Sequence, residues 1–139
     1  MGIRENILVA VKAKLGEIAD AAVVREVKEP DVKWVKAMQG DSTHLLVVID
    51  GAEPAVVAEK GTRKYLNHME IQINGYSKDK DTPSETMNAL LHEVKAKMEE
   101  DPVWGDNAYQ TTRLRMEIIP NLERLHPGFR LHYEIKYKE

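Results

Sequence analysis

The chain has 139 residues, a formal net charge of −3 and no cysteine. This length predicts one domain, residues 1–139, that buries enough surface for a hydrophobic core. The lack of cysteine excludes disulfide bonds, thiolate metal ligands and a cysteine nucleophile. Charged residues interrupt the apolar runs, so we expect neither a signal peptide nor a membrane span.

Charge is distributed unevenly along the chain. Residues 41–112 carry 13 acidic and 7 basic side chains, whereas residues 113–139 carry 4 acidic and 6 basic ones. This balance of acidic and basic residues argues against a protein that binds nucleic acid by neutralising its phosphates. It is compatible with nucleic acid that passes the protein without adhering to it.

The first half of the chain predicts one helix and several strands. Apolar residues spaced by three or four predict an amphipathic helix from Arg4 to about Ala21. Ala22–Lys28 has the composition of a short strand, and Asp31–Met38 fits either a helical turn capped by its first residue or a second strand. The apolar run Leu45–Ile49 predicts a central strand. Residues 50–64 then form either a hairpin arm or a functional loop.

A strand and a helix follow with clearer local signals. Residues 65–76 alternate between apolar and polar side chains, which predicts a strand with one buried face. Thr82, Pro83 and Glu85 form a capping-box pattern with proline at the first helical position. The helix that begins there is predicted to bury Met87, Leu90, Leu91, Val94 and Met98.

Two further strands complete the predicted domain, at residues 108–119 and 129–137, and both alternate between apolar and polar side chains. Strands with one apolar face suit a sheet that helices cover on one side only. The sequence therefore predicts an α+β, two-layer domain. Its sheet is mainly antiparallel, with about four to five strands, and two amphipathic helices lie on one face.

No residue pattern in the sequence indicates a catalytic centre. The five histidines lack metal-ligand spacing, and neither a phosphate-binding glycine motif nor a nucleophile elbow is present. His68 and His132 could be neighbours on a polar sheet face, with Glu70 or Glu134 beside them, although a solvated surface is the simpler explanation. We therefore predict no enzyme activity, no cofactor and no metal site. The alternative is a small α+β enzyme or ligand-binding domain with a site on the polar sheet face.

Basic residues near the end of the chain are candidates for an interface. Arg113 and Arg115 are predicted to line one sheet face, where Arg130, His132 and Lys136 can accompany them. A solvated face is the plain explanation of this pattern. The functional explanation is electrostatic docking against an acidic partner, such as the acidic middle segment of a second copy.

Two tryptophans in irregular segments are the other interface candidates. Trp34 and Trp104 each have a large amphipathic ring in a stretch without clear periodicity. Such a ring either plugs a small satellite core or anchors an interface. The sequence leaves both explanations open.

Several stretches together resemble the tail terminator or tail-completion proteins of long-tailed bacteriophages, a group that includes minor tail proteins. The resemblance covers nearly all of the chain and runs through RENILVAVKAKLGEI, HLLVVIDGAEP, INGYSKDKDTPSETMNALLHEVKAKM, DNAYQTTRLRMEI and HPGFRLHYEIKY. It implies a small α+β domain that forms a homohexameric ring. Such a ring caps the tail tube, ends polymerisation of the tube protein and presents a surface to the head-completion protein.

The resemblance also implies where the protein works. DNA passes through the lumen of such a ring without specific binding, and no membrane or cofactor takes part. The expected location is the head-proximal end of the tail in the virion, and the host cytoplasm during assembly. A head–tail connector component, such as a stopper or adaptor, is the alternative within the same class.

A ring of identical copies requires heterologous contacts between neighbours. We expect the terminal strand to offer an edge to a neighbour's arm from residues 50–64. Carboxylates that line the lumen would repel the phosphates of DNA. The candidates for contacts with another copy or with the tube are Glu53, Glu59, Arg63, Lys64, Arg113, Arg115, Trp34 and Trp104.

Overall fold

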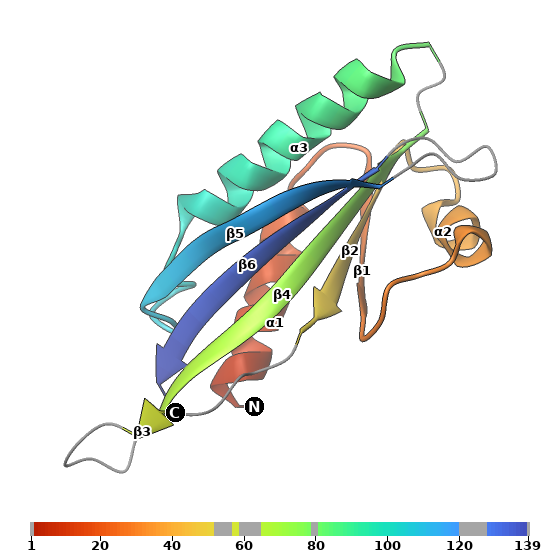
Figure 1. Cartoon of the computed structure of the whole chain (residues 1–139). Coiled ribbons are helices and arrows are strands. Elements are labelled where there is room, and N and C mark those ends of the chain that lie inside the picture. The colour runs from red at the N-terminus through yellow and green to blue at the C-terminus, as the bar shows by residue number, and fades with distance from the viewer. Residues whose placement is uncertain (1, 52–56, 59–64, 79–80, 120–127, 139) are drawn as a thin grey trace.

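A computed structural model of the chain describes residues 2–51, 57–58, 65–78, 81–119 and 128–138. These residues form one mixed sheet with three helices, which confirms the predicted α+β fold (Figure 1). In chain order the elements are α1 (Ile3–Leu15), β1 (Ala21–Glu26), α2 (Val32–Gln39), β2 (His44–Asp50), β3 (Val57–Ala58), β4 (Tyr65–Ser77), α3 (Pro83–Glu100), β5 (Gln110–Ile119) and β6 (Gly128–Lys138). Within these ranges, no helix has both the length and the apolar character needed to cross a membrane.

The strands are ordered β1-β2-β4-β6-β5, and the short β3 pairs with β4. The β1–β2 pair is parallel and the other pairs are antiparallel. The terminal strand β6 therefore lies between β4 and β5, so the prediction that it offers a free edge is wrong. The physical reason is that β6 forms long antiparallel ladders on both sides, which satisfy its backbone groups.

Part of the stretch between β2 and β4 is described. Val57 and Ala58 pair antiparallel with Leu66 and Tyr65, in the arrangement of a hairpin. Of the two alternatives for residues 50–64, the described part thus agrees with the hairpin arm.

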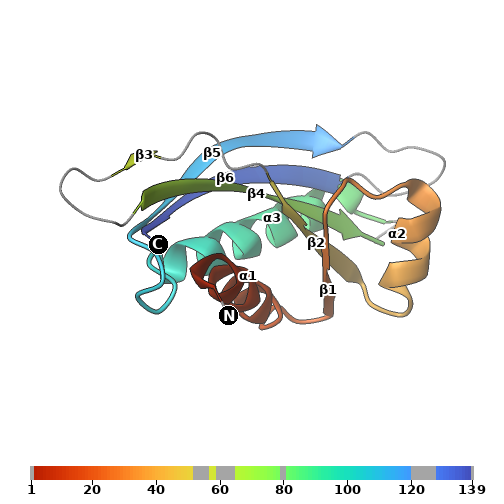
Figure 2. The same ribbon diagram turned by 90° about the horizontal axis from the view of Figure 1, so that it is seen from below.

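Helices α1 and α3 cover one face of the sheet, as Figure 2 shows. The predicted stripe of α3 is buried, and so are four apolar residues of α1. The helix α1 ends at Leu15, earlier than predicted, because Gly16 occupies the C-cap. The strands contribute alternate side chains to this core, namely Met69, Ile71 and Ile73 from β4 and Phe129, Leu131, Tyr133, Ile135 and Tyr137 from β6.

The start of α3 agrees with the prediction in position but not in hydrogen bonding. Thr82 occupies the N-cap and Pro83 begins the helix, yet the Thr82 side chain makes no capping hydrogen bond. The backbone bond from Thr86 N to Thr82 O, at 3.0 Å, closes the first turn instead. The missing N–H of proline is harmless there, because the first turn has no partner for it.

The ambiguous stretch after β1 is a helix, α2. The Asp31 carboxylate caps it and accepts a hydrogen bond from Trp34 N at 2.8 Å. Val35 of α2 packs in a second, smaller core with Leu45, Val47 and Ile49, on the sheet face opposite α1 and α3. Both faces of β2 are therefore covered, which explains its unbroken apolar run.

Candidate functional site: the open face of the sheet

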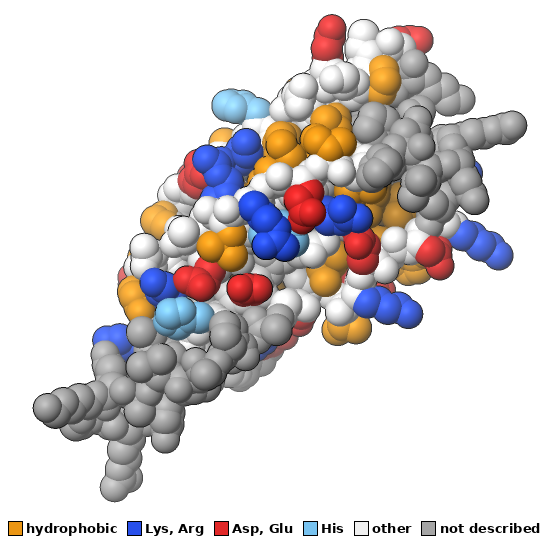
Figure 3. All heavy atoms as spheres, in the orientation of Figure 1, with side chains coloured by type: hydrophobic (Ala, Val, Ile, Leu, Met, Phe, Trp, Pro, Cys, Tyr) orange, Lys and Arg blue, Asp and Glu red, His pale blue; other side chains and the backbone are white. Residues whose placement is uncertain are grey.

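We call the sheet surface opposite α1 and α3 the open face. It consists of alternate side chains of three strands, and α2 covers the sheet on this side only near β2. Figure 3 shows acidic and basic side chains intermixed across it rather than gathered in separate patches. Its residues include His68, Glu70, Gln72 and Asn74 of β4, Arg130, His132, Glu134 and Lys136 of β6, and Gln110, Thr112, Arg115 and Glu117 of β5.

A hydrogen-bonded cluster ties the loop after β1 to the open face. Asn74 is fully buried, and its Nδ2 donates to Glu29 Oε1 and to the Tyr76 hydroxyl, both at 3.1 Å. Gln72 Nε2 donates to Asn74 Oδ1 at 2.8 Å, and Arg130 forms an ion pair with the same Glu29 carboxylate. Burial raises the pKa of the Tyr76 hydroxyl, so this group stays neutral. Glu29 thus fixes β4, β6 and the loop relative to one another.

A second cluster joins β5 to β6. His132 Nε2 lies 2.6 Å from Glu117 Oε1, and Arg115 Nε donates to the same oxygen at 3.3 Å. The hydrogen bond from His132, assisted by Arg115, lowers the pKa of Glu117. Glu117 therefore remains a carboxylate, and both His132 and Arg115 contact it on the surface.

The third cluster lies further along β6. His68 Nδ1 is 3.7 Å from Glu134 Oε2, and Lys136 Nζ is 3.8 Å from the other oxygen of that carboxylate. His68 lies opposite Lys136 in the β4–β6 ladder, whereas His132 lies opposite Gln72. The two histidines thus share the open face, as proposed from the sequence, but each has its own glutamate. Among the described residues no group of three or more His, Asp or Glu side chains is placed to hold a metal ion.

The electrostatic consequence is a face whose positive charges are matched locally. Arg115, Arg130 and Lys136 each lie within 4.0 Å of a carboxylate of the same chain. Paired surface charges project little field beyond a Debye length of about 8 Å at physiological salt. This face therefore exerts little long-range attraction on an acidic partner.

The prediction that Arg113 and Arg115 line the same sheet face is wrong. Arg113 lies opposite Tyr133, whereas Arg115 lies opposite His132, so a β-bulge at Leu114 shifts the register between them. Because neighbouring residues of β6 point to opposite sides, the bulge places Arg115 on the open face and Arg113 on the helix-covered side. The Arg113 guanidinium accordingly pairs with Glu99 of α3 at 3.3 Å.

The two tryptophans have different surroundings. Trp104 is only 2% exposed and belongs to the main core, so it is buried as a core residue but not in a small satellite core as predicted. Its Nε1 donates to Thr111 Oγ1 at 2.9 Å, which locks the connection between α3 and β5. Trp34 is half-buried and packs against the second core.

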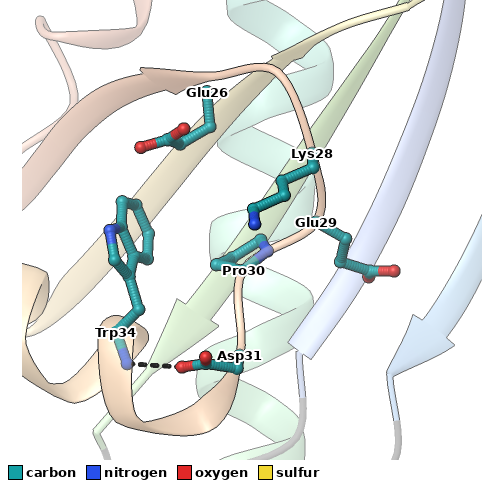
Figure 4. Close-up of a pocket in the computed structure, with 6 residues that line it drawn as sticks. All are labelled: Glu26, Lys28, Glu29, Pro30, Asp31 and Trp34. Atoms are coloured by element: carbon teal, nitrogen blue, oxygen red, sulfur yellow. Dashed lines mark hydrogen bonds between the residues drawn. The ribbon is translucent and has the colours of Figure 1, made fainter.

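Trp34 also lines a shallow pocket at the start of α2, shown in Figure 4. The pocket holds about 250 Å³, less than the roughly 300–1,000 Å³ typical of small-molecule sites. Two of its acidic residues already have partners. Asp31 caps α2, and Glu29 contacts Arg130 and Asn74. The lining residues are Glu26, Lys28, Glu29, Pro30, Asp31 and Trp34.

The remaining predicted interface residues, Glu53, Glu59, Arg63 and Lys64, lie outside the described part of the chain. Conversely, Glu29 and Asn74, which organise the first cluster, were not predicted as site residues. Asn74 carried a weak signal, since it sits on the polar side of a predicted strand. Glu29 carried none, because its partners are 45 and 101 residues away.

Comparisons with known proteins identify no family for this chain. No family model matches it, and no curated protein matches it. A chain of the solved structure described as "Virion of native gene transfer agent (GTA) particle" is similar, with a TM-score of 0.42 and 12% sequence identity. That match covers 99% of this chain and 92% of the other. The similarity is too low to support an argument about function.

Proposed function

We propose that this protein is a structural component of a phage virion that caps the tail tube as a homohexameric ring. In this role it ends polymerisation of the tube protein and forms the surface that joins the tail to the head. The observation that carries the proposal is the correspondence between the sequence resemblance and the folded elements. The stretches that resemble tail terminators supply most of α1, β2, α3, β5 and β6, together with the last five residues of β4, Ile73–Ser77.

The organisation of the domain supports this proposal in physical terms. One layer of helices encloses the core, while the open face presents polar side chains that hydrogen bonds and ion pairs hold in place. A preorganised surface loses little side-chain entropy when another protein docks on it. Its locally matched charges also favour a partner with a complementary pattern and give little attraction to the phosphates of passing DNA.

The experiment that tests the proposal is an assembly assay with tube subunits. Purified protein added to polymerising tube subunits should shorten the tubes and leave a ring at one tube end in electron micrographs. Native mass spectrometry of the capped tubes' end complex should give six copies per ring. Tubes of unchanged length without end rings would contradict the proposal, and binding to head-completion protein alone would favour the connector alternative.

A matched pair of variants tests whether the open face takes part. Glu134→Lys reverses a charge on the open face, and Glu93→Lys makes the same change on the exposed side of α3. We expect Glu134→Lys to weaken tube capping and Glu93→Lys to leave it unchanged. Equal behaviour of the two variants would remove the open face from the contact surface.

A further inference from the structure

Among the described strands, β5 lies at one edge of the sheet and exposes apolar side chains. It lies at the end of the strand order and, in the described part of the chain, pairs only with β6. Leu114, Met116 and Ile118 are 45%, 40% and 50% exposed. A long edge strand with exposed apolar residues is a template for pairing with another strand. The alternation predicted from the sequence holds from Arg115 to Ile118, but its apolar side chains are only partly covered.

The order of residues around Met116 suits pairing with an identical strand. Arg115 and Glu117 flank Met116, and both lie on the open face, opposite His132 and Arg130. Met116 lies opposite Leu131, on the helix-covered side. In an antiparallel pair centred on Met116, Arg115 of each copy therefore lies opposite Glu117 of the other copy, on the same face.

Charge selects this register over its neighbours. A pair centred on Arg115 would place two arginines opposite each other, and a pair centred on Glu117 would place two glutamates opposite each other. Like charges directly opposite each other destabilise a strand pair, whereas opposite charges stabilise it. The register centred on Met116 also brings the two Met116 side chains together at the two-fold axis and joins two apolar edges.

We propose that a second copy of this chain is the occupant of this edge. The two copies pair antiparallel through residues 114–118 and continue the sheet across a two-fold axis. The bulge at Leu114 limits the ladder to these residues, because it bends the strand beyond them. This pair uses the same surface on both copies, unlike the heterologous contacts of a ring, so it does not rest on the proposed function. It describes the protein free in solution, before any ring closes.

Charge exchange tests the pairing. Arg115→Glu and Glu117→Arg each place two like-charge pairs across the axis, so each variant alone should show a dissociation constant raised about tenfold or more. A mixture of the two variants restores two opposite-charge pairs and should form heterodimers. Sedimentation equilibrium measures all three samples, and thermal unfolding of each variant shows that the monomer fold is retained.

A cysteine at the axis gives an independent measurement. The chain has no cysteine, so Met116→Cys introduces its single thiol. Side chains directly opposite each other in an antiparallel pair are close enough for a disulfide. Mild oxidation should crosslink Met116→Cys into dimers, and Val27→Cys, at a 77% exposed site that follows the strand β1, should stay monomeric. A monomeric wild-type protein would overturn the proposal, and so would equal crosslinking of the two cysteine variants. Failure of the Arg115→Glu and Glu117→Arg variants to form heterodimers would overturn it as well.

Discussion

The two faces of the sheet are made from the same strands but differ in chemistry. On the helix-covered face, alternate residues of β4 and β6 are apolar and fully buried under α1 and α3. On the open face, the intervening residues form three clusters of hydrogen bonds and ion pairs. Burial of apolar area dominates folding stability, whereas exposed ion pairs contribute little to it. The covered face therefore supplies most of the stability of the domain, and the open face contributes little to it.

Each face of the sheet contains a buried polar side chain that departs from this division. The Tyr133 hydroxyl is buried under the helices without a hydrogen-bond partner among the described residues, and burial raises its pKa to about 12. Conversely, Asn74 belongs to the open face but is fully buried beneath Glu29. The covered face therefore tolerates a neutral polar group, and the open face contains one rigid point.

The largest expected loss of stability follows from a substitution at Trp104, in the core of the covered face. We expect Trp104→Ala to lower the free energy of unfolding by about 3–5 kcal/mol, because it leaves a cavity in the main core. Trp34→Ala, at a half-buried ring on the other side of the sheet, should cost less than half as much. Urea unfolding of both variants gives the comparison. Equal losses would mean that the second core matters as much as the first.

The next effect concerns close packing between β4 and β6. A side chain at Gly75 would place its Cβ 2.3 Å from the Phe129 ring. We expect Gly75→Ala to destabilise the protein by about 1–3 kcal/mol through overpacking. Gly16→Ala, at the αR C-cap of α1, is the control and should change stability by less than about 1 kcal/mol. The double variant Gly75→Ala with Phe129→Leu relieves the predicted clash. If its free energy of unfolding in urea is no higher than that of Gly75→Ala alone, the steric explanation fails.

A change at Asn74 tests the rigid point of the open face. Asn74→Ala leaves the Glu29 carboxylate and the Gln72 amide without a buried partner, so we expect a loss of about 1–3 kcal/mol. Gln72→Ala removes one donor from the same cluster at a half-buried site and should have a smaller effect. Chemical denaturation measures the difference. A larger loss for Gln72→Ala would show that Asn74 does not organise this cluster.

The smallest expected effect is a pH dependence at His44. Burial lowers the pKa of His44 below its ordinary value of 6.5, and its Nδ1 is buried without a hydrogen-bond partner among the described residues. As pH falls below 6.5, the unfolded chain takes up a proton at His44 before the folded chain does, so stability decreases. Replacing His44 by Gln should flatten the pH profile of the melting temperature below this value. The exposed His92→Gln serves as control, and identical profiles for both variants would exclude His44 as the cause.

Much of the local structure could be predicted because it depends on neighbours in sequence. The helix α3 was predicted with its buried stripe, since spacing and a proline at the first turn are local signals. The two faces of β4 and β6 followed from the two-residue period of a strand. The candidate site was predicted less well. His68 and His132 were placed on the correct face, but Glu29 was missed because its partners are remote in sequence.

By itself, the sequence determined the fold class, the elements with clear periodicity and the polarity of each face. Only the tertiary structure decided that β6 is internal, that Asp31–Met38 is helical, and that Trp104 lies in the core. It also decided that a bulge at Leu114 separates Arg113 from Arg115, and that apolar side chains of β5 are partly exposed. The physical reason is that periodicity reports which side of an element avoids water. Strand order, bulges and coverage depend instead on pairing and packing between segments that are distant in the chain.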